Sequence, residues 1–291
     1  KAKKRLLYVA LSLAITVVLL VGVLMMHTSA ADTAADSGTP YVTILGKNVE
    51  YSDKLHIMFA LDTNYPENAG VEFWSSEDDI GSAELGYTRE IYGYVDDESL
   101  VGSAVYGKPY VRTAGIAAKN IVKDIYARAY VTVDGETYYS DVIRYSVLEY
   151  MHERLFDLSG IDDAQKTAKQ KNQVILYNRT LEYAASAQAV LGTDEGDRSA
   201  SADYVFVEVE GGTLEDGYTS GLYSPGESIT VSVTDAAGFR GWSTDGENVI
   251  AGSGVADYTF TPDGSVRLTA MYVAPPATVI VNDGEGVEYD I

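Results

Sequence analysis

The chain has 291 residues and no cysteine, and its 43 acidic against 21 basic residues give a net formal charge of −22. Such a charge repels phosphate backbones and anionic lipids, which argues against nucleic-acid binding. The lack of cysteine excludes disulfides, thiolate metal sites and cysteine nucleophiles. The length predicts two or three domains, and a hydrophobic content of 46% is that of a folded chain.

A charge-free run near the N-terminus indicates where the rest of the chain functions. Leu6 to Met26 follows a basic cluster and, at about 1.5 Å per residue, is long enough to cross a bilayer as a helix. Thr28 to Ala31 then offers the small residues that signal peptidase accepts. We expect residues 1–31 to be a signal peptide, with a retained signal anchor as the alternative. Either places the remainder outside the cell, with membrane contact only through this segment.

The next part of the chain has a β pattern. Residues 32–40 are a small polar linker, and the pattern begins at Tyr41. In Lys54 to Leu61 apolar and less apolar side chains alternate, and residues 70–74 and 84–95 are rich in β-branched and aromatic types. Strands at this spacing, without helical periodicity between them, predict an antiparallel sandwich of the immunoglobulin or fibronectin type.

A β-hairpin is the clearest local feature. Apolar side chains alternate with polar ones from Ile125 to Val133, Asp134-Gly135 supplies the turn, and Thr137 to Ile143 returns. Tyr126 and Tyr130 should share the outer face of this hairpin. Exposed rings there could stack on sugars or anchor a protein partner, so these two residues are the candidate ligand contacts. Cross-strand packing, or cover from the following helices, is the alternative explanation.

Two helices are expected after the hairpin. Ser146 and Glu149 form a capping-box pattern, and Gly160 ends the first helix. The second runs from about Asp162 to Gly192. Its apolar stripe consists of Val174, Tyr177, Leu181, Ala184 and Leu191. Neither helix is apolar all round, so both should pack on the preceding sheet or on each other.

The hairpin and helices therefore complete a domain spanning residues 41–192, and a second linker, residues 193–203, follows. Residues 204–273 form a compact β module in which Phe239 and Trp242 should be core residues. Residues 274–291 read as the start of a further module or a tail.

Two resemblances to known families follow from these segments. Residues 204–273 contain YVFVEVEGG, YSPGESITVSV, GFRGW and DYTFTPDGSVRLTAMY in order, a set that resembles the internalin-type B repeat and its divergent relatives in bacterial surface proteins. That resemblance implies a small β-grasp-like fold, used in adhesins and as a spacer. Residues 113–191, which end in YAASAQAVL, resemble an uncharacterised module of large secreted clostridial proteins. This second resemblance implies that the hairpin and helices belong to one domain.

No catalytic signature is present. His56 and His152 are the histidines that remain after the leader, they lie far apart in sequence, and no G-x-S-x-G motif occurs. We therefore expect packing or surface histidines, no catalytic residue and no enzyme. The acidic clusters at 77–79, 96–98 and 194–197 lack EF-hand spacing. Calcium is nonetheless the one cofactor that we retain as a candidate there, beside the interpretation that these are solvated surface charges.

The leading hypothesis is a non-catalytic exported surface or secreted protein of a Gram-positive-like bacterium. Its modules would be adhesin-like, or would space and present a binding function toward an extracellular protein or glycan. The alternative is an accessory glycan-binding region of an extracellular carbohydrate-active protein. A third hypothesis is an adhesin made rigid by calcium.

Overall fold

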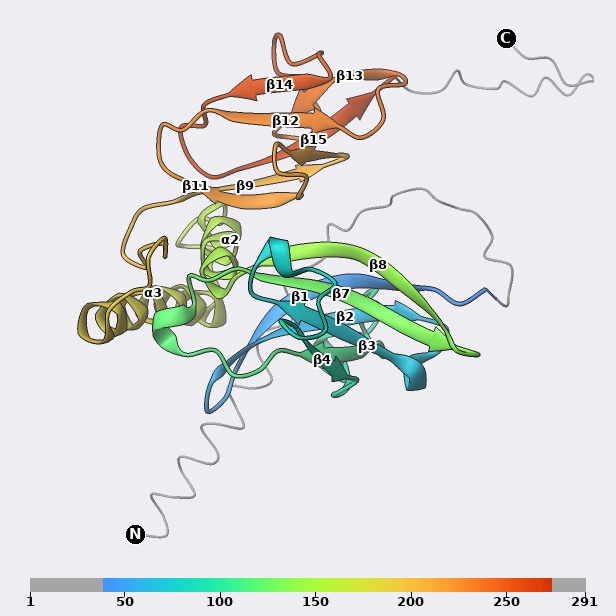
Figure 1. Cartoon of the computed structure of the whole chain (residues 1–291). Helices are drawn as coiled ribbons and strands as arrows, with labels where there is room; N and C mark the ends of the chain where they lie inside the picture. The colour runs from blue at the N-terminus through green and yellow to red at the C-terminus, as the bar shows by residue number, and fades with distance from the viewer. Residues whose placement is uncertain (1–38, 274–291) are drawn as a thin grey trace, which may run out of the picture. The chain divides into compact units, whose positions relative to one another are not determined.

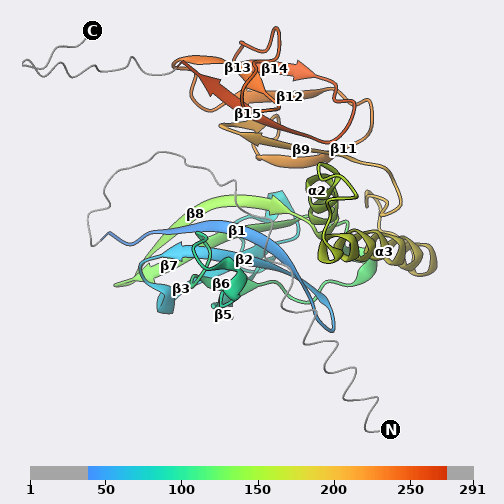
Figure 2. The same ribbon diagram turned by 180° about the vertical axis from the view of Figure 1, so that it is seen from behind.

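The computed structural model describes residues 39–273, so the predicted export segment and the tail from 274 lie outside the described residues. The chain divides into two compact units, with the boundary between Phe206 and Val207. Both are built mainly from β-strands, and both α-helices belong to the first unit (Figures 1 and 2), which confirms the expected fold class. Neither described helix combines the length and the apolar character needed to span a membrane.

The first unit contains a β-sandwich of two four-stranded sheets. One has the strand order β1-β2-β6-β5 and the other β4-β3-β7-β8. The strands are β1 (Val42–Tyr51), β2 (Leu55–Thr63), β3 (Ala69–Trp74), β4 (Tyr87–Glu90), β5 (Gly93–Tyr94), β6 (Pro109–Arg112), β7 (Ile125–Val133) and β8 (Glu136–Tyr145). Lettered in chain order these sheets read A-B-E-D and C′-C-F-G, which is the immunoglobulin arrangement with one added edge strand.

The core of the sandwich lies between the inner faces of these sheets. The predicted alternation in β2 is confirmed, because Ile57, Phe59 and Leu61 are fully buried. The Phe59 ring lies 5.7 Å from that of Phe73 on β3, so the two sheets meet through aromatic contact. Burial of one such side chain contributes about 1.5–3 kcal/mol.

The β7–β8 hairpin forms as predicted. Val133 pairs with Glu136, which leaves Asp134 and Gly135 as the two turn residues. Their φ angles are 53° and 84°. Positive φ at both positions is the type I′ turn, whose twist matches that of the flanking strands.

Two helices follow the sandwich, α2 (Val147–Ser159) and α3 (Ala168–Leu191). The Ser146 side chain accepts a hydrogen bond from the Glu149 amide at 3.1 Å and begins α2 as predicted, and Gly160 follows its last residue. The predicted start of α3 at Asp162 is wrong. Asp162 instead forms a local turn, its side chain accepting from the Ala164 amide at 2.8 Å.

The start of α3 is set by a different cap. Thr167 and Gln170 form a reciprocal capping box, with the Thr167 amide donating to Gln170 Oε1 at 2.8 Å and the Gln170 amide donating to Thr167 Oγ1 at 3.2 Å. Two orphan amides are satisfied there, whereas the Asp162 side chain, which also has a glutamine three residues later, accepts from the Ala164 amide instead. The helix ends at Gly192, as predicted.

The apolar stripe of α3 is only partly buried. Tyr177 and Ala184 are buried as expected, whereas Leu191 is 67% exposed, so its assignment to the stripe is wrong. Gln188 takes the buried position near the helix end. Its side chain donates to Arg198 O at 3.0 Å and accepts from the Ala200 amide at 2.9 Å. The 193–203 segment is therefore fastened to the first unit.

A buried polar network joins the helices to the sandwich. The Tyr145 hydroxyl donates to Glu153, and Glu153 pairs with Arg154 at 3.0 Å. Glu153 and Arg154 are only 7% and 6% exposed. The Tyr150 hydroxyl donates to Asn48 Oδ1 on β1 at 2.7 Å, and its ring meets Tyr177 of α3 edge-on at 5.9 Å. Contacts from β8, β1, α2 and α3 thus converge in one network.

The second unit contains a mixed and an antiparallel sheet, ordered β11-β9-β15-β13 and β10-β12-β14. The strands are β9 (Val205–Glu210), β10 (Gly212–Leu214), β11 (Ser220–Tyr223), β12 (Ile229–Val233), β13 (Phe239–Ser243), β14 (Asp257–Phe260) and β15 (Val266–Tyr272). β9 and β15, the first and last strands, are central and parallel. That order is compatible with a β-grasp sheet, although the described residues of this unit include no α-helix. Trp242 is fully buried 5.4 Å from the Phe239 ring, as predicted.

Removing Arg154 should be far more costly than removing an exposed arginine of the same helical pair. Arg154→Met leaves the buried Glu153 carboxylate without its cation, so we expect the free energy of unfolding to fall by about 3–5 kcal/mol. Arg179→Met breaks the exposed Arg179–Glu182 pair and should leave stability nearly unchanged. Urea denaturation of the purified variants measures both. Equal losses of unfolding free energy in the two variants would show that the burial of Arg154 and Glu153 does not make their ion pair more important than the exposed one.

Candidate functional site

Both predicted ligand-contact residues lie on the outer face of the β4-β3-β7-β8 sheet. Tyr126 and Tyr130 alternate along β7 with the fully buried Ala127 and Ala129, so their side chains leave the sheet away from the core. Both are half-buried. Their cross-strand neighbours are Trp74 and Arg144 for Tyr126, and Gly70 and Tyr139 for Tyr130.

Arg128 occupies the centre of this surface. Its guanidinium donates to Glu72 Oε2 at 2.7 Å and stacks over the Tyr139 ring, 4.0 Å from the centroid. The Trp74 ring lies 5.3 Å away on the same guanidinium. Tyr139 remains 49% exposed. We name Glu72, Tyr126, Arg128, Tyr130 and Tyr139 the tyrosine face.

The rings of the tyrosine face are held by the backbone beneath them. A Cβ on Gly70 would lie 2.6 Å from the Tyr130 hydroxyl oxygen, so the ring requires glycine at that position. Burial, followed by the nearby Glu90 and Glu72 carboxylates, raises the pKa of Tyr130, and the phenol stays neutral. The face therefore offers fixed planar rings and one oriented ion pair, which suit stacking and hydrogen bonding.

A second arrangement of this kind lies on the outer face of the β1-β2-β6-β5 sheet, and no sequence pattern predicts it. The Arg112 guanidinium sits 3.6 Å over the Tyr92 ring and donates to both Glu50 carboxylate oxygens at 3.0 and 3.1 Å. The Tyr110 ring lies 5.7 Å from that of Tyr92. We name Glu50, Tyr92, Tyr110 and Arg112 the β6 platform. Because β5 has only two residues, strand alternation does not reveal this face in the sequence.

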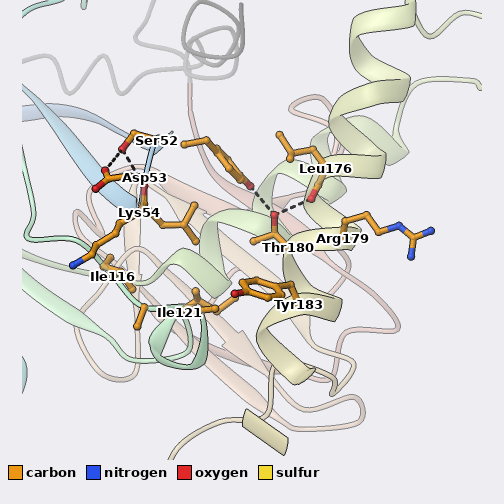
Figure 3. Close-up of a pocket in the computed structure, with 13 residues that line it drawn as sticks. Ser52, Asp53, Lys54, Ile116, Ile121, Leu176, Arg179, Thr180 and Tyr183 are labelled. Atoms are coloured by element: carbon orange, nitrogen blue, oxygen red, sulfur yellow. Dashed lines mark hydrogen bonds between the residues drawn. The ribbon is translucent and has the colours of Figure 1, made fainter. Parts of the chain in front are cut away.

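A cavity of about 390 Å³ is a third feature of the first unit. The β1–β2 turn, the segment 116–121 and α3 line it (Figure 3). Its apolar lining residues are Leu55, Ile116, Ala117, Ala118, Ile121 and Leu176. These segments are far apart in sequence, so no local pattern could have predicted the cavity.

Two hydroxyl groups of this cavity are neutral and bonded to each other. The Tyr51 hydroxyl lies 3.2 Å from Thr180 Oγ1, which donates to Leu176 O at 2.8 Å. Burial raises the pKa of Tyr51, so its phenol remains protonated. The Arg179 side chain points away from Thr180 and Tyr183 in Figure 3 and pairs with Glu182. The cavity therefore joins an apolar lining to neutral hydroxyl groups, and Asp53, Lys54 and Arg179 also line it.

The two histidines are packing residues, as expected. His56 is buried, with Nδ1 2.8 Å from Thr113 O. His152 on α2 packs edge-on against the Tyr204 ring at 5.5 Å. Burial lowers the pKa of His152, Asp203 opposes this shift and Arg198 adds to it. Each ring contacts protein, and the two histidines lie on different elements, His56 on β2 and His152 on α2.

The candidate calcium clusters differ in their surroundings. Residues 77–79 form a 3₁₀ turn, and Asp194 pairs with Lys123, which lowers the pKa of the Asp194 carboxyl. Lys119 lies 4.0 Å from the same carboxylate, so ammonium groups hold a position that a cation would need. Within residues 39–273, no three His, Cys, Asp or Glu side chains are grouped to hold a metal. Calcium binding stays a prediction.

Protonation of His152 should destabilise the first unit below neutral pH. Its pKa in the fold lies below the ordinary value of about 6.5, so the unfolded chain binds the proton more tightly. The neutral His152 ring therefore contributes its full stabilisation at pH values above about 6.5, and this stabilisation is lost as the pH falls below that value. We expect urea denaturation to show a smaller loss between pH 7.5 and 5.0 for His152→Phe, which retains a ring against Tyr204, than for the parent. An identical pH response in both proteins would refute this assignment.

Comparison of the chain with protein-family models, with curated proteins and with solved structures gave no match. The internalin-type and clostridial resemblances therefore stay predictions from sequence motifs. The function has to be argued from the two outer faces and the cavity.

Proposed function

We propose that this chain is a non-catalytic exported surface or secreted protein whose sandwich binds an extracellular protein through the tyrosine face. The observation that carries the proposal is the Arg128 guanidinium, paired with Glu72 and stacked on the half-exposed Tyr139. The second unit acts as a spacer that presents the sandwich. The sandwich and spacer together give the adhesin-like organisation that the surface-protein resemblance implies.

Protein recognition suits the composition of the tyrosine face. Tyrosine, tryptophan and arginine are enriched at the energetic centres of protein interfaces. Ordering a flexible side chain on binding costs about 0.5–1.5 kcal/mol. Gly70 holds the Tyr130 ring in place, and Glu72 and Tyr139 hold Arg128. Because these side chains are already ordered in the free protein, binding a partner loses less conformational entropy.

The non-catalytic part of the proposal rests on how the reactive groups are used. His56 contacts a backbone carbonyl and His152 packs against a ring, so neither is oriented toward a serine or threonine nucleophile. The exposed rings and the ion pair supply stacking and hydrogen bonds, which serve binding.

Export is supported by the charge-free segment after the basic N-terminal cluster and by the acidic, cysteine-free composition. Expression of the tagged protein in a Gram-positive host, followed by fractionation, tests it. We expect the protein in the medium or envelope and accessible to external protease. Recovery of the intact polypeptide from the cytosol, with residues 1–31 attached, would contradict export.

Loss of the tyrosine face should abolish partner binding without unfolding the sandwich. We expect the purified protein to bind a member of an array of fibronectin, fibrinogen, collagen and mucin, and Tyr139→Ala to weaken that binding by about tenfold or more. Tyr183→Ala is the matched control, because Tyr183 is 68% exposed on α3, away from this sheet. Equal losses for the two variants, or binding to no protein of the array, would count against the tyrosine face.

A second candidate function is that of an accessory glycan-binding region in an extracellular carbohydrate-active protein. The β6 platform is the specific observation that favours it, because Tyr92 is exposed beside an oriented guanidinium–carboxylate pair. Exposed rings and planar polar side chains together can bind the apolar face and the hydroxyl edge of a sugar.

A further inference from the structure

We propose that the β6 platform is a binding site for a neutral oligosaccharide. This inference rests on the second candidate function and assigns it a surface. It is independent of the tyrosine face, which lies on the other sheet, so either assignment can stand if the other is wrong.

The aromatic part of the platform is Tyr92 with Tyr110. The Arg112 guanidinium covers one side of the Tyr92 ring at 3.6 Å, yet Tyr92 is still 55% exposed. Tyr92 therefore keeps a large exposed area although the guanidinium stacks on its ring. A Cβ on Gly93 would lie 3.2 Å from the Tyr110 ring, so that ring rests against the backbone of β5 and is fixed in place. Two fixed rings 5.7 Å apart form a small apolar surface on which a sugar ring can lie.

The polar part of the platform has unused hydrogen-bonding groups. Among the described residues, only the Nη1 atom of Arg112 donates to protein, and both of its bonds go to Glu50. The Nη2 and Nε donors remain available for a ligand, because a guanidinium carries five N–H groups. Glu50 likewise keeps acceptor capacity beyond these two bonds. Donors and acceptors held side by side match adjacent sugar hydroxyls, each of which both donates and accepts.

The charge around the platform selects a neutral glycan. Arg112 and Glu50 offset each other, and the Glu50 and Asp96 carboxylates act on Tyr110 strongly enough to help burial raise its pKa. An anionic sugar would meet that negative field in a chain of net charge −22. Neutral pyranosides gain stacking and hydrogen bonds without this repulsion.

The platform is also bounded, which suits a sugar better than a protein. Val95, Leu100 and Val105 pack with Ala60 on the adjoining part of this sheet and cover it. Tyr110 also packs against this cluster, so the exposed part of the platform is centred on Tyr92, whereas specific protein interfaces bury about 800 Å² on each partner. A few sugar units need far less surface.

Calorimetric titration of the purified protein with cellohexaose, xylohexaose and laminarihexaose tests the proposal, with hexagalacturonic acid as the anionic comparison. We expect at least one neutral hexasaccharide to bind and the anionic one not to bind. Tyr92→Ala should weaken the affinity by about tenfold. Arg112→Lys, which keeps the charge but loses the planar fork, should also weaken it and serves if Tyr92→Ala proves unstable in a thermal melt.

Two exposed tyrosines elsewhere provide matched controls. Tyr139→Ala on the tyrosine face and Tyr183→Ala on α3 should leave glycan affinity within about twofold. Binding of no hexasaccharide, or loss with Tyr139→Ala but not with Tyr92→Ala, would overturn the assignment to the β6 platform. Binding of the anionic hexasaccharide alone would overturn the proposed neutral ligand. None of these outcomes bears on protein binding by the tyrosine face, which the protein array tests separately.

Discussion

The first unit depends on one buried ion pair, Glu153 with Arg154. Removing two charges from water costs several kcal/mol per ion, and only good geometry with further hydrogen bonds offsets that cost. Tyr145 donates to Glu153, and Asp157 accepts from Arg154 at 2.9 Å, so both partners are further satisfied. The Tyr145–Glu153 hydrogen bond can form only while the end of β8 and α2 keep their relative position. Its burial is therefore a constraint that joins the helices to the sandwich.

The surfaces follow from this constraint. With α2 fixed, Tyr150 meets Tyr177, and α3 lies against residues 116–121 to leave the cavity of Figure 3. Both ribbon views place the helical pair at one end of the sandwich, and neither outer face is covered by a helix (Figures 1 and 2). Tyr126 and Tyr130 lie beside cross-strand neighbours on β3 and β8. Cross-strand packing accounts for part of their burial, and Tyr139 remains exposed beside them.

Sequence patterns predicted the parts of the fold that are decided locally. The Asp134-Gly135 turn, the alternation in β2 and the Ser146 cap each depend on neighbours a few residues away. The predicted start of α3 is wrong because Asp162 and Thr167 both resemble caps and each has a glutamine three residues later, Gln165 and Gln170, so the local pattern does not choose between them. The β6 platform was not predicted, because it joins Glu50 to Tyr92 and Arg112 across three strands. Only the strand order brings these residues together.

The two outer faces share one arrangement of side chains. The exposure of its tyrosine rings argues for a role beyond stabilising the fold. In each, an arginine pairs with a glutamate and stacks on a tyrosine: Arg128 pairs with Glu72 on the neighbouring strand β3, and Arg112 pairs with Glu50 on β1, across the intervening strand β2. Both ion pairs are partly buried, so desolvation offsets much of the attraction between their charges, and a stacked ring adds about 0.5–1 kcal/mol where it is exposed. A purely stabilising role would favour covering these rings, since burial raises the apolar contribution. Tyr92 and Tyr139 instead keep about half of their surface in solvent, so the stacked arginine orients rings that a ligand can still reach.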